Sequence, residues 1–360
     1  MQETRSGGSI ACETDRNEPI SAAKRPRSES ASSPSSGDID SMSDHRIPLF
    51  GRLAAALPDL VLRGGLHAAA GAASLSPWCR RARANLDLAL GKELDEASRN
   101  RTARACLHHA ARIASEWLRL SRLEGTGRRA ARVQRWMEEN ISIDESIHHF
   151  DAELDAGRGV VIATAHIGNW ELLGARLVPH VRAHGVNPVA VGLDRHGWLR
   201  RLRESYGVES LPQNTHPRRL LEVLAAGRPI ALLADMEVRR LAGTFLPFFG
   251  TDALTMTAPA ALARSAGCAI LPMRCYIPRG ETGYHICAEP PLSIDPDLPR
   301  KEATHALTRR LNSVYETWIR ETPEQWAWYQ PRWRTRPGTL DAIPLKARAD
   351  RPDLPGANDG

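Results

Sequence analysis

The chain has 360 residues, 42% of them hydrophobic and 25% charged, which is enough for a sizeable core and typical of a globular protein rather than a fibrous one. Its formal net charge is +6, and nearly all of its basic residues are arginine. A basic surface suits nucleic acid, anionic lipid or an acidic carrier protein, so charge alone does not choose between these partners. Six cysteines without a C-x-x-C pair argue against a structural zinc site and fit reduced thiols in a cytoplasm.

Both ends of the sequence are predicted to lie outside the folded domain. Residues 1–45 hold eleven serines and almost no large apolar side chains, so we expect a disordered tail. Met42 is an alternative start, and the first residues lack the apolar stretch of a signal peptide. Residues 341–360 are rich in Pro, Asp and Gly and are expected to be loose. The domain is therefore placed at 46–340.

The first part of this domain, 46–150, has the pattern of a helical section. Apolar residues recur at helical spacing between Arg101 and Leu123, and no strand-like run appears. The stretch from Leu53 to Trp78 is interrupted by charged residues and a proline, so no helix is expected to span a membrane. This stretch fits an amphipathic core helix, with a helix lying on a membrane surface as the alternative.

The pattern changes at Gly159, and residues 151–340 predict an α/β core. Short apolar runs typical of buried strands alternate with helical segments, which favours a mostly parallel central sheet flanked by helices. Active sites in such sheets lie beyond the carboxyl ends of the strands. The expected strands are 159–165, 188–193, 229–234, 269–277 and 284–288, and the expected helices are 170–184, 196–206, 216–226, 257–266 and 301–320.

A candidate catalytic pair follows the first of these strands. His166 stands at its carboxyl end, and Glu171 comes five residues later. In one continuous helix the two side chains would point about 140° apart, so a contact requires a turn. Gly168 permits that turn, and Asn169 can cap a helix after it. The carboxylate would then hold Nδ1 of the imidazole and leave Nε2 free to take a proton from a hydroxyl.

A structural interpretation of the same residues stays open. His166 would cap the helix, and Glu171 would be a solvated acid in its first turn, favoured by the helix dipole. Likewise, the aromatic and arginine run over 318–336 fits either a membrane interface or a packed helix end with Arg stacked on Trp.

The segment after the first strand resembles a known motif. H-x-G-N-W-E over 166–171 is similar to the H-x4-[D/E] motif of glycerolipid-type acyltransferases, and in particular to the lipid A late acyltransferases, the lauroyl and myristoyl transferases. One such motif is common by chance, whereas four ordered blocks over roughly 155–337 are not. The other three blocks are Ala234-Asp235 with the F-x-P-F-F-G segment of 243–250, Thr255 to Pro272, and the P-E-Q-x-x-W…R-x-x-x-R-P signature of 323–337.

The resemblance implies an acyl thioester donor, either acyl carrier protein or coenzyme A, and a glycolipid hydroxyl as acceptor, such as that of a lipid A precursor. It implies no metal and no organic cofactor. His166 would be the general base, oriented by Glu171. We expect a peripheral protein on the cytoplasmic face of a bacterial inner membrane, with no nucleic acid partner. Val208 and Gln330 depart from the family pattern, which leaves another glycolipid open as the acceptor.

Further residues are expected to bind substrate. Asn169 lies beside the base, and Arg195, just past the second strand, is a candidate partner for a phosphate or carbonyl, with a surface salt bridge as the alternative. Asp235, after the third strand, would line the pocket or hold an arginine, with a cap as the alternative. Arg239 follows closely and could meet an anionic headgroup or carrier.

Two other functions use the same features. A lipid or thioester hydrolase would direct the same dyad at water, although the sequence lacks the G-x-S-x-G and H-E-x-x-H motifs of serine and zinc hydrolases. A non-catalytic, basic lipid-binding protein would use the arginines and aromatic residues and would not need His166.

Overall fold

The computed structural model describes residues 59–121, 128–192, 197–238, 241 and 243–338. The tails predicted at 1–45 and 341–360 lie outside these ranges, so their disorder stays a prediction.

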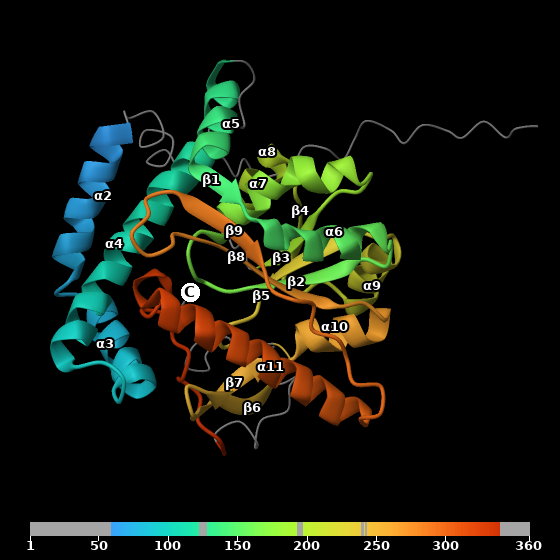
Figure 1. Ribbon diagram of the computed structural model, residues 1–360. Coiled ribbons are helices and arrows are strands. Elements are labelled where there is room, and N and C mark those ends of the chain that lie inside the picture. Colours follow the sequence, from blue (N-terminus) through green and yellow to red (C-terminus); the bar gives the residue numbers. More distant parts are fainter. Residues whose placement is uncertain (1–58, 122–127, 193–196, 239–240, 242, 339–360) are drawn as a thin grey trace, which may run out of the picture. The chain divides into compact units, whose positions relative to one another are not determined.

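A seven-stranded sheet lies at the centre of the described fold, with its layers of helices visible in Figure 1. Its strands are β1 (Ile141–Ile143), β2 (Val160–Thr164), β3 (Val189–Gly192), β4 (Glu209–Pro212), β5 (Pro229–Leu233), β8 (Ile270–Tyr276) and β9 (Tyr284–Ala288). They lie in the order β1-β9-β8-β2-β5-β3-β4, and each neighbouring pair in this sheet is parallel except β8 with β9. The mostly parallel sheet predicted from the sequence is confirmed.

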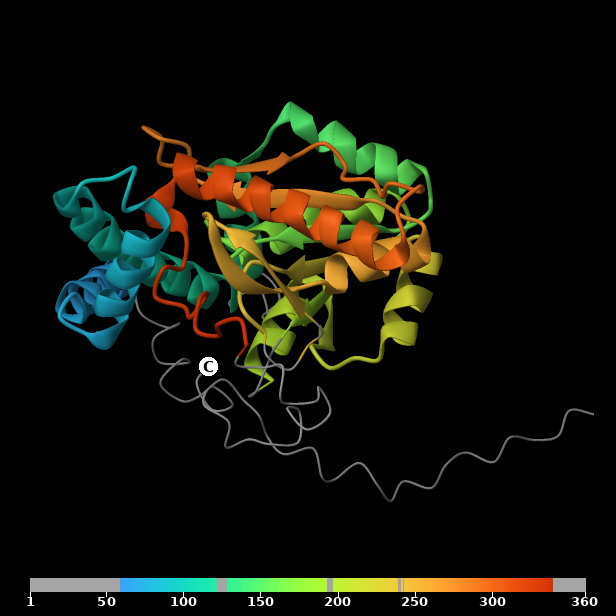
Figure 2. The same cartoon turned by 90° about the horizontal axis from the view of Figure 1, so that it is seen from below.

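Helices cover both faces of this sheet (Figures 1 and 2). The helices of the described fold are α2 (Asp59–Ala73), α3 (Pro77–Leu90), α4 (Glu96–Leu120), α5 (Arg128–Asn140), α6 (His148–Asp155), α7 (Trp170–Ala183), α8 (Trp198–Tyr206), α9 (Pro217–Ala225), α10 (Ala258–Ala266) and α11 (Arg300–Glu321). Of these, α2 and α3 pack mainly against α4, beside the sheet (Figure 1). Successive residues of β2 point to opposite faces, as the twofold period of a strand requires. Val160 and Ile162 pack with residues of α5 to α8, and Val161 and Ala163 pack with residues of α9 to α11.

The core matches all of the predicted strands and helices of 151–340, but three features were not predicted. β1 lies inside the section expected to be helical. It was not predicted, because three residues are too few to show the twofold period of a strand. β4 is a short, half-buried edge strand. The third is an antiparallel hairpin of β6 (Gly243–Phe248) and β7 (Thr251–Met256). Its two turn residues, Phe249 and Gly250, both have positive φ, which is typical of a type I′ turn.

The N-terminal helices confirm the helical section and place its exposed apolar residues. Of the stretch from Leu53 to Trp78, residues 53–58 lie outside the described ranges, and the rest is interrupted, since α2 ends at Ala73 and α3 begins after the N-cap Ser76. Leu75 and Trp78, at this turn, are 87% and 59% exposed. Among the described residues, no helix combines the length and the apolar character needed to cross a membrane.

Candidate active site

The register of two neighbouring strands brings His166 and Asp235 together. β2 and β5 are parallel, with Thr164 paired to Leu233. His166 and Asp235 each follow two residues after this pair. Nδ1 of His166 lies 2.8 Å from Oδ1 of Asp235, and the backbone N–H of His166 donates to Oδ2, also at 2.8 Å. The predicted place of His166, at the carboxyl end of a buried strand, is confirmed.

This contact fixes the proton on the histidine ring. Asp235 is fully buried, and although burial alone raises its pKa, the hydrogen bonds and charge of His166 hold the pKa below its usual value. An ionised carboxylate only accepts, so Nδ1 of His166 must be the donor. In the neutral ring Nε2 then carries the lone pair, and the side chain is 23% exposed. The arrangement is that of a base held by an acid.

The prediction that Glu171 holds His166 is wrong. α7 begins at Trp170, and Glu171 in its first turn is buried against α8 instead. Its carboxylate accepts from Nη2 of Arg203 at 2.7 Å and from the Tyr206 hydroxyl at 2.5 Å. Burial lowers the pKa of Arg203, but the Glu171 carboxylate outweighs this and raises it, while burial and Glu171 both raise the pKa of Tyr206. Glu171 therefore joins α7 to α8 as part of a buried ion pair.

The turn between β2 and α7 has the two features that the sequence predicted. Gly168 has φ +58°, and a Cβ placed there would lie 1.9 Å from the carbonyl oxygen of Cys275, so no other residue fits. Asn169 caps α7 by accepting from the N–H of Leu172. Its own N–H donates to the Cys275 carbonyl at 2.8 Å, which ties the turn to β8.

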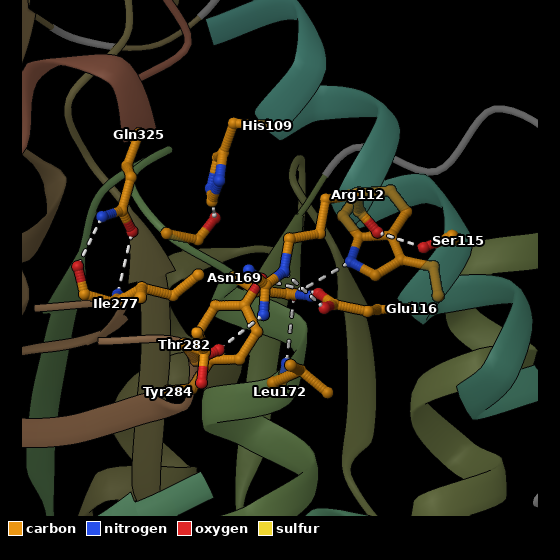
Figure 3. A network of polar contacts seen from close by, with 12 residues as sticks. His109, Arg112, Ser115, Glu116, Asn169, Leu172, Ile277, Thr282, Tyr284 and Gln325 are labelled. Atoms are coloured by element: carbon orange, nitrogen blue, oxygen red, sulfur yellow. Dashed lines mark hydrogen bonds and ion pairs between the residues drawn. The ribbon is translucent and has the colours of Figure 1, made fainter. Parts of the chain in front are cut away.

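The Asn169 side chain points into a buried polar network (Figure 3). Its Nδ2 donates to Glu116 at 2.8 Å, and its Oδ1 accepts from the indole of Trp117 at 3.1 Å. Glu116 also accepts from Arg112 and from the Tyr284 hydroxyl. Since Asn169 is fully buried and its side chain has protein partners at both ends, we withdraw the expected contact with substrate and assign it to holding the turn.

A histidine that the sequence analysis missed supports the same turn. Nε2 of His109, on α4, lies 3.2 Å from the carbonyl oxygen of Gly168 (Figure 3). Burial lowers the pKa of His109 to about 4, so the ring is neutral near pH 7 and donates its Nε2 proton to this carbonyl. The helical periodicity of α4 gives no sign of this role.

The C-terminal signature, 323–337, also contacts the His166–Asp235 pair. Ile167 and Trp326 form an isolated antiparallel bridge, flanked by backbone hydrogen bonds of 3.0 and 3.1 Å between 166–168 and 325–327. The indole of Trp326 then donates to Oδ2 of Asp235 at 2.7 Å. The block thus contributes both backbone and side-chain support to the pair.

The tryptophans and Arg332 of the aromatic and arginine run are packed inside the protein, whereas Arg334 is half-buried and Arg336 is exposed. Trp318, Trp326 and Trp328 are at most 1% exposed. Arg332 is fully buried, lies over the Phe248 ring, and donates to the Leu254 carbonyl and the Thr255 hydroxyl. Its burial lowers the pKa of Arg332 to about 10. For these residues the packed helix end, not the membrane interface, is the correct interpretation.

An apolar cavity lies beside the pair, between α7 and the sheet. Trp170 lines it, and the centroid of the Trp170 ring is 4.9 Å from that of His166. Its other apolar lining residues include Ile162, Leu173, Leu177, Val181, Val189 and Val191. Two expected substrate contacts, Arg195 and Arg239, lie outside the described residues, so they stay predictions.

Comparison with known proteins gives one family. The family model described as bacterial lipid A biosynthesis acyltransferase matches residues 47–335. A phosphatidylinositol mannoside acyltransferase of Mycolicibacterium smegmatis is 31% identical over 80% of this chain and 94% of its own length. The corresponding protein of Mycobacterium tuberculosis is 31% identical over 52% of this chain and 58% of its own. A lipid A biosynthesis lauroyltransferase of Escherichia coli is 27% identical over 57% and 64%, respectively.

Proposed function

The chain belongs to the bacterial lipid A biosynthesis acyltransferase family and is an acyltransferase, and from this premise we propose that it moves a fatty acyl group from a thioester to a hydroxyl of a membrane glycolipid. The observation that supports this reaction is the His166–Asp235 contact at the carboxyl ends of β2 and β5. The resemblance implied the same chemistry, but the acid that orients the base is Asp235 and not Glu171.

In this mechanism, Nε2 of His166 takes the proton of the acceptor hydroxyl while the oxygen of that hydroxyl attacks the thioester carbonyl. A carbon–oxygen bond forms, the carbon–sulfur bond breaks, and the imidazolium returns its proton to the leaving thiolate. Asp235 stabilises the charged ring, and Trp326 and the His166 N–H hold the carboxylate in place. No covalent acyl-enzyme is required.

The apolar cavity is the proposed site for the acyl chain. It starts beside the base at Trp170 and is walled by aliphatic side chains of α7, β2 and β3. A saturated chain there would be removed from water at about 0.8 kcal/mol per buried CH₂ group. The buried Glu171–Arg203 pair lies on its wall, which gives that pair a part in shaping the cavity.

The donor and acceptor are proposed by chemical class. The net charge of +6 suits an anionic donor, and we propose acyl carrier protein, which is acidic; the phosphates of coenzyme A suit the same charge, so the product analysis compares both donors. The named relatives are a phosphatidylinositol mannoside acyltransferase and a lauroyltransferase of lipid A biosynthesis, so the acceptor that we propose is a sugar hydroxyl of a lipid. Such an acceptor lies in a membrane, and the exposed Leu75 and Trp78 support peripheral docking there. The cytoplasmic face of the inner membrane follows if acyl carrier protein is the donor.

The test is a product analysis. Purified wild type and His166→Ala are incubated with acyl carrier protein thioesters or acyl-coenzyme A, together with a lipid extract of the cell envelope, and products are followed by mass spectrometry. We expect wild type alone to add one acyl group to a glycolipid, whose mass identifies the acceptor class. Release of free fatty acid without acylated lipid would favour the hydrolase. Membrane binding by both proteins without turnover would favour a non-catalytic lipid-binding protein.

A further inference from the structure

A cluster of metal-ligand side chains lies between α6 and the carboxyl end of α7, away from His166. Asp151 and Asp155 are four residues apart on α6, and His180 and His184 are four residues apart at the end of α7. Residues at this spacing share one face of a helix. Nε2 of His184 lies 3.8 Å from Oδ1 of Asp151 and 3.7 Å from Oδ1 of Asp155, and Nε2 of His180 contacts the same Asp151 oxygen.

From this geometry we propose a divalent transition-metal site, with Zn²⁺ as the best fit, formed by Asp151, His180 and His184. One ligand atom from each of the three residues lies within 4.8 Å of the others. Asp155, 74% exposed, or a water would complete a four-coordinate site. The proposal is independent of the acyl-transfer function.

The orientation of His184 is the one that a metal ligand requires. Its Nδ1 lies 3.1 Å from the backbone oxygen of His180, and since a carbonyl only accepts, Nδ1 carries the proton. Nε2 therefore presents its lone pair toward the carboxylates. Histidines that bind metals commonly donate their other N–H to a carbonyl or a carboxylate in this way. His180 is held as well, because its ring stacks on Phe150 at 6.1 Å between centroids.

The donor set determines the kind of ion. Two imidazoles and a carboxylate suit Zn²⁺, whereas Ca²⁺ and Mg²⁺ prefer oxygen ligands alone. Ligand atoms around tetrahedral zinc are about 3.4 Å apart. The His184–Asp151 distance of 3.8 Å is already near this value, the shorter His180–Asp151 contact must lengthen, and the two imidazole nitrogens, which lie within 4.8 Å of each other, must close by at most about 1.4 Å. Their side chains are 22–34% exposed, which leaves room for this movement and a path for the ion. Because the Asp151 carboxylate only accepts, Nε2 of His180 carries the proton in their contact. The ion would take the place of this proton, which moves to Nδ1 of the same ring or to water.

A bound ion would join α6 to the carboxyl end of α7. α6 contributes Phe150 to the wall of the apolar cavity, and α7 contributes Leu173, Leu177 and Val181. The other end of α7 follows directly on the His166 turn. Bound metal should therefore raise the melting temperature, because an ion that binds only the folded chain stabilises it.

The test measures Zn²⁺ binding by the untagged full chain, with a chromophoric chelator as competitor. We expect one equivalent in wild type and at least a tenfold loss of affinity in His184→Gln and in Asp151→Asn. The matched control is His285→Gln. His285 also pairs with a carboxylate, that of Glu281 at 2.6 Å, but among the described residues it belongs to no group of three metal ligands. The Zn²⁺ affinity of this variant should therefore equal that of wild type. Melting curves in EDTA verify that each variant is folded.

Two results would overturn the proposal: no stoichiometric binding by wild type, or wild-type affinity in both folded ligand variants. If a variant does not fold, X-ray absorption of the zinc-loaded wild type decides the question. Two imidazole ligands would support the site, and a shell without imidazole would exclude it.

Discussion

The indole of Trp326 donates a 2.7 Å hydrogen bond to Oδ2 of Asp235, while His166 shares the other oxygen of that carboxylate. The two partners come from segments 91 residues apart in the sequence. The acid of the proposed pair is therefore held on both sides, and each contact has a separate consequence for activity.

Trp326→Phe removes one of these contacts and keeps most of the packing. We expect kcat to fall about 10–100-fold, because a hydrogen bond to a charged group contributes about 1.5–3 kcal/mol. Trp318→Phe is the control: its indole also donates to a carboxylate, that of Glu289 at 2.7 Å, and is equally buried. This control should lose stability but not kcat. Equal kcat losses in the two variants would mean that Trp326 acts through packing alone.

The turn after β2 depends on Gly168. Gly168→Ala should abolish activity and reduce the free energy of unfolding by more than the cost of a positive φ, about 1–2 kcal/mol. The excess comes from the Cβ, which would lie 1.9 Å from the Cys275 carbonyl. Gly185→Ala isolates the backbone term, because Gly185 also has positive φ but nothing within 4 Å of a Cβ. Denaturant unfolding of the two variants should give clearly different losses, and similar losses would contradict the close approach.

His109 should make the fold sensitive to acid. Its folded pKa of about 4 lies below the 6.5 of a free imidazole, so the unfolded chain binds more protons between these values. The contribution of the neutral His109 to the free energy of unfolding is fully present above pH 6.5 and is lost as the pH falls toward 4. Between these pH values the free energy of unfolding changes by at most about 1.4 kcal/mol per pH unit because of His109, which corresponds to the uptake of one proton on unfolding. Urea unfolding of His109→Gln across pH 4–7 should show a flatter dependence than wild type, whereas parallel curves would mean that the ring is not buried as a neutral donor.

The sequence predicted the sheet, its core helices and the place of His166 because strands buried on both faces leave continuous apolar runs. Gly168 and Asn169 were predictable because a turn and a cap depend on local chemistry. The partner of His166 was not, since Asp235 reaches it only if β5 lies next to β2, and β3 comes between them in the sequence. Glu171 was near in sequence, but the start of α7 at Trp170 directs it to Arg203. Trp326 and His109 depend on tertiary contacts that no periodicity reveals.

In the proposed reaction Asp235, and not Glu171, orients His166. The direct measurement is kcat per folded molecule for Asp235→Asn and Glu171→Gln in the glycolipid acylation assay. Asp235→Asn should lose about 10⁴ in kcat, as when the acid of a catalytic triad becomes an amide. Glu171→Gln should instead lose about 3–5 kcal/mol of stability, because it leaves buried Arg203 without its counterion, and keep most of its kcat. A large loss of kcat in folded Glu171→Gln with near-normal turnover by Asp235→Asn would mean that Asp235 does not orient the base.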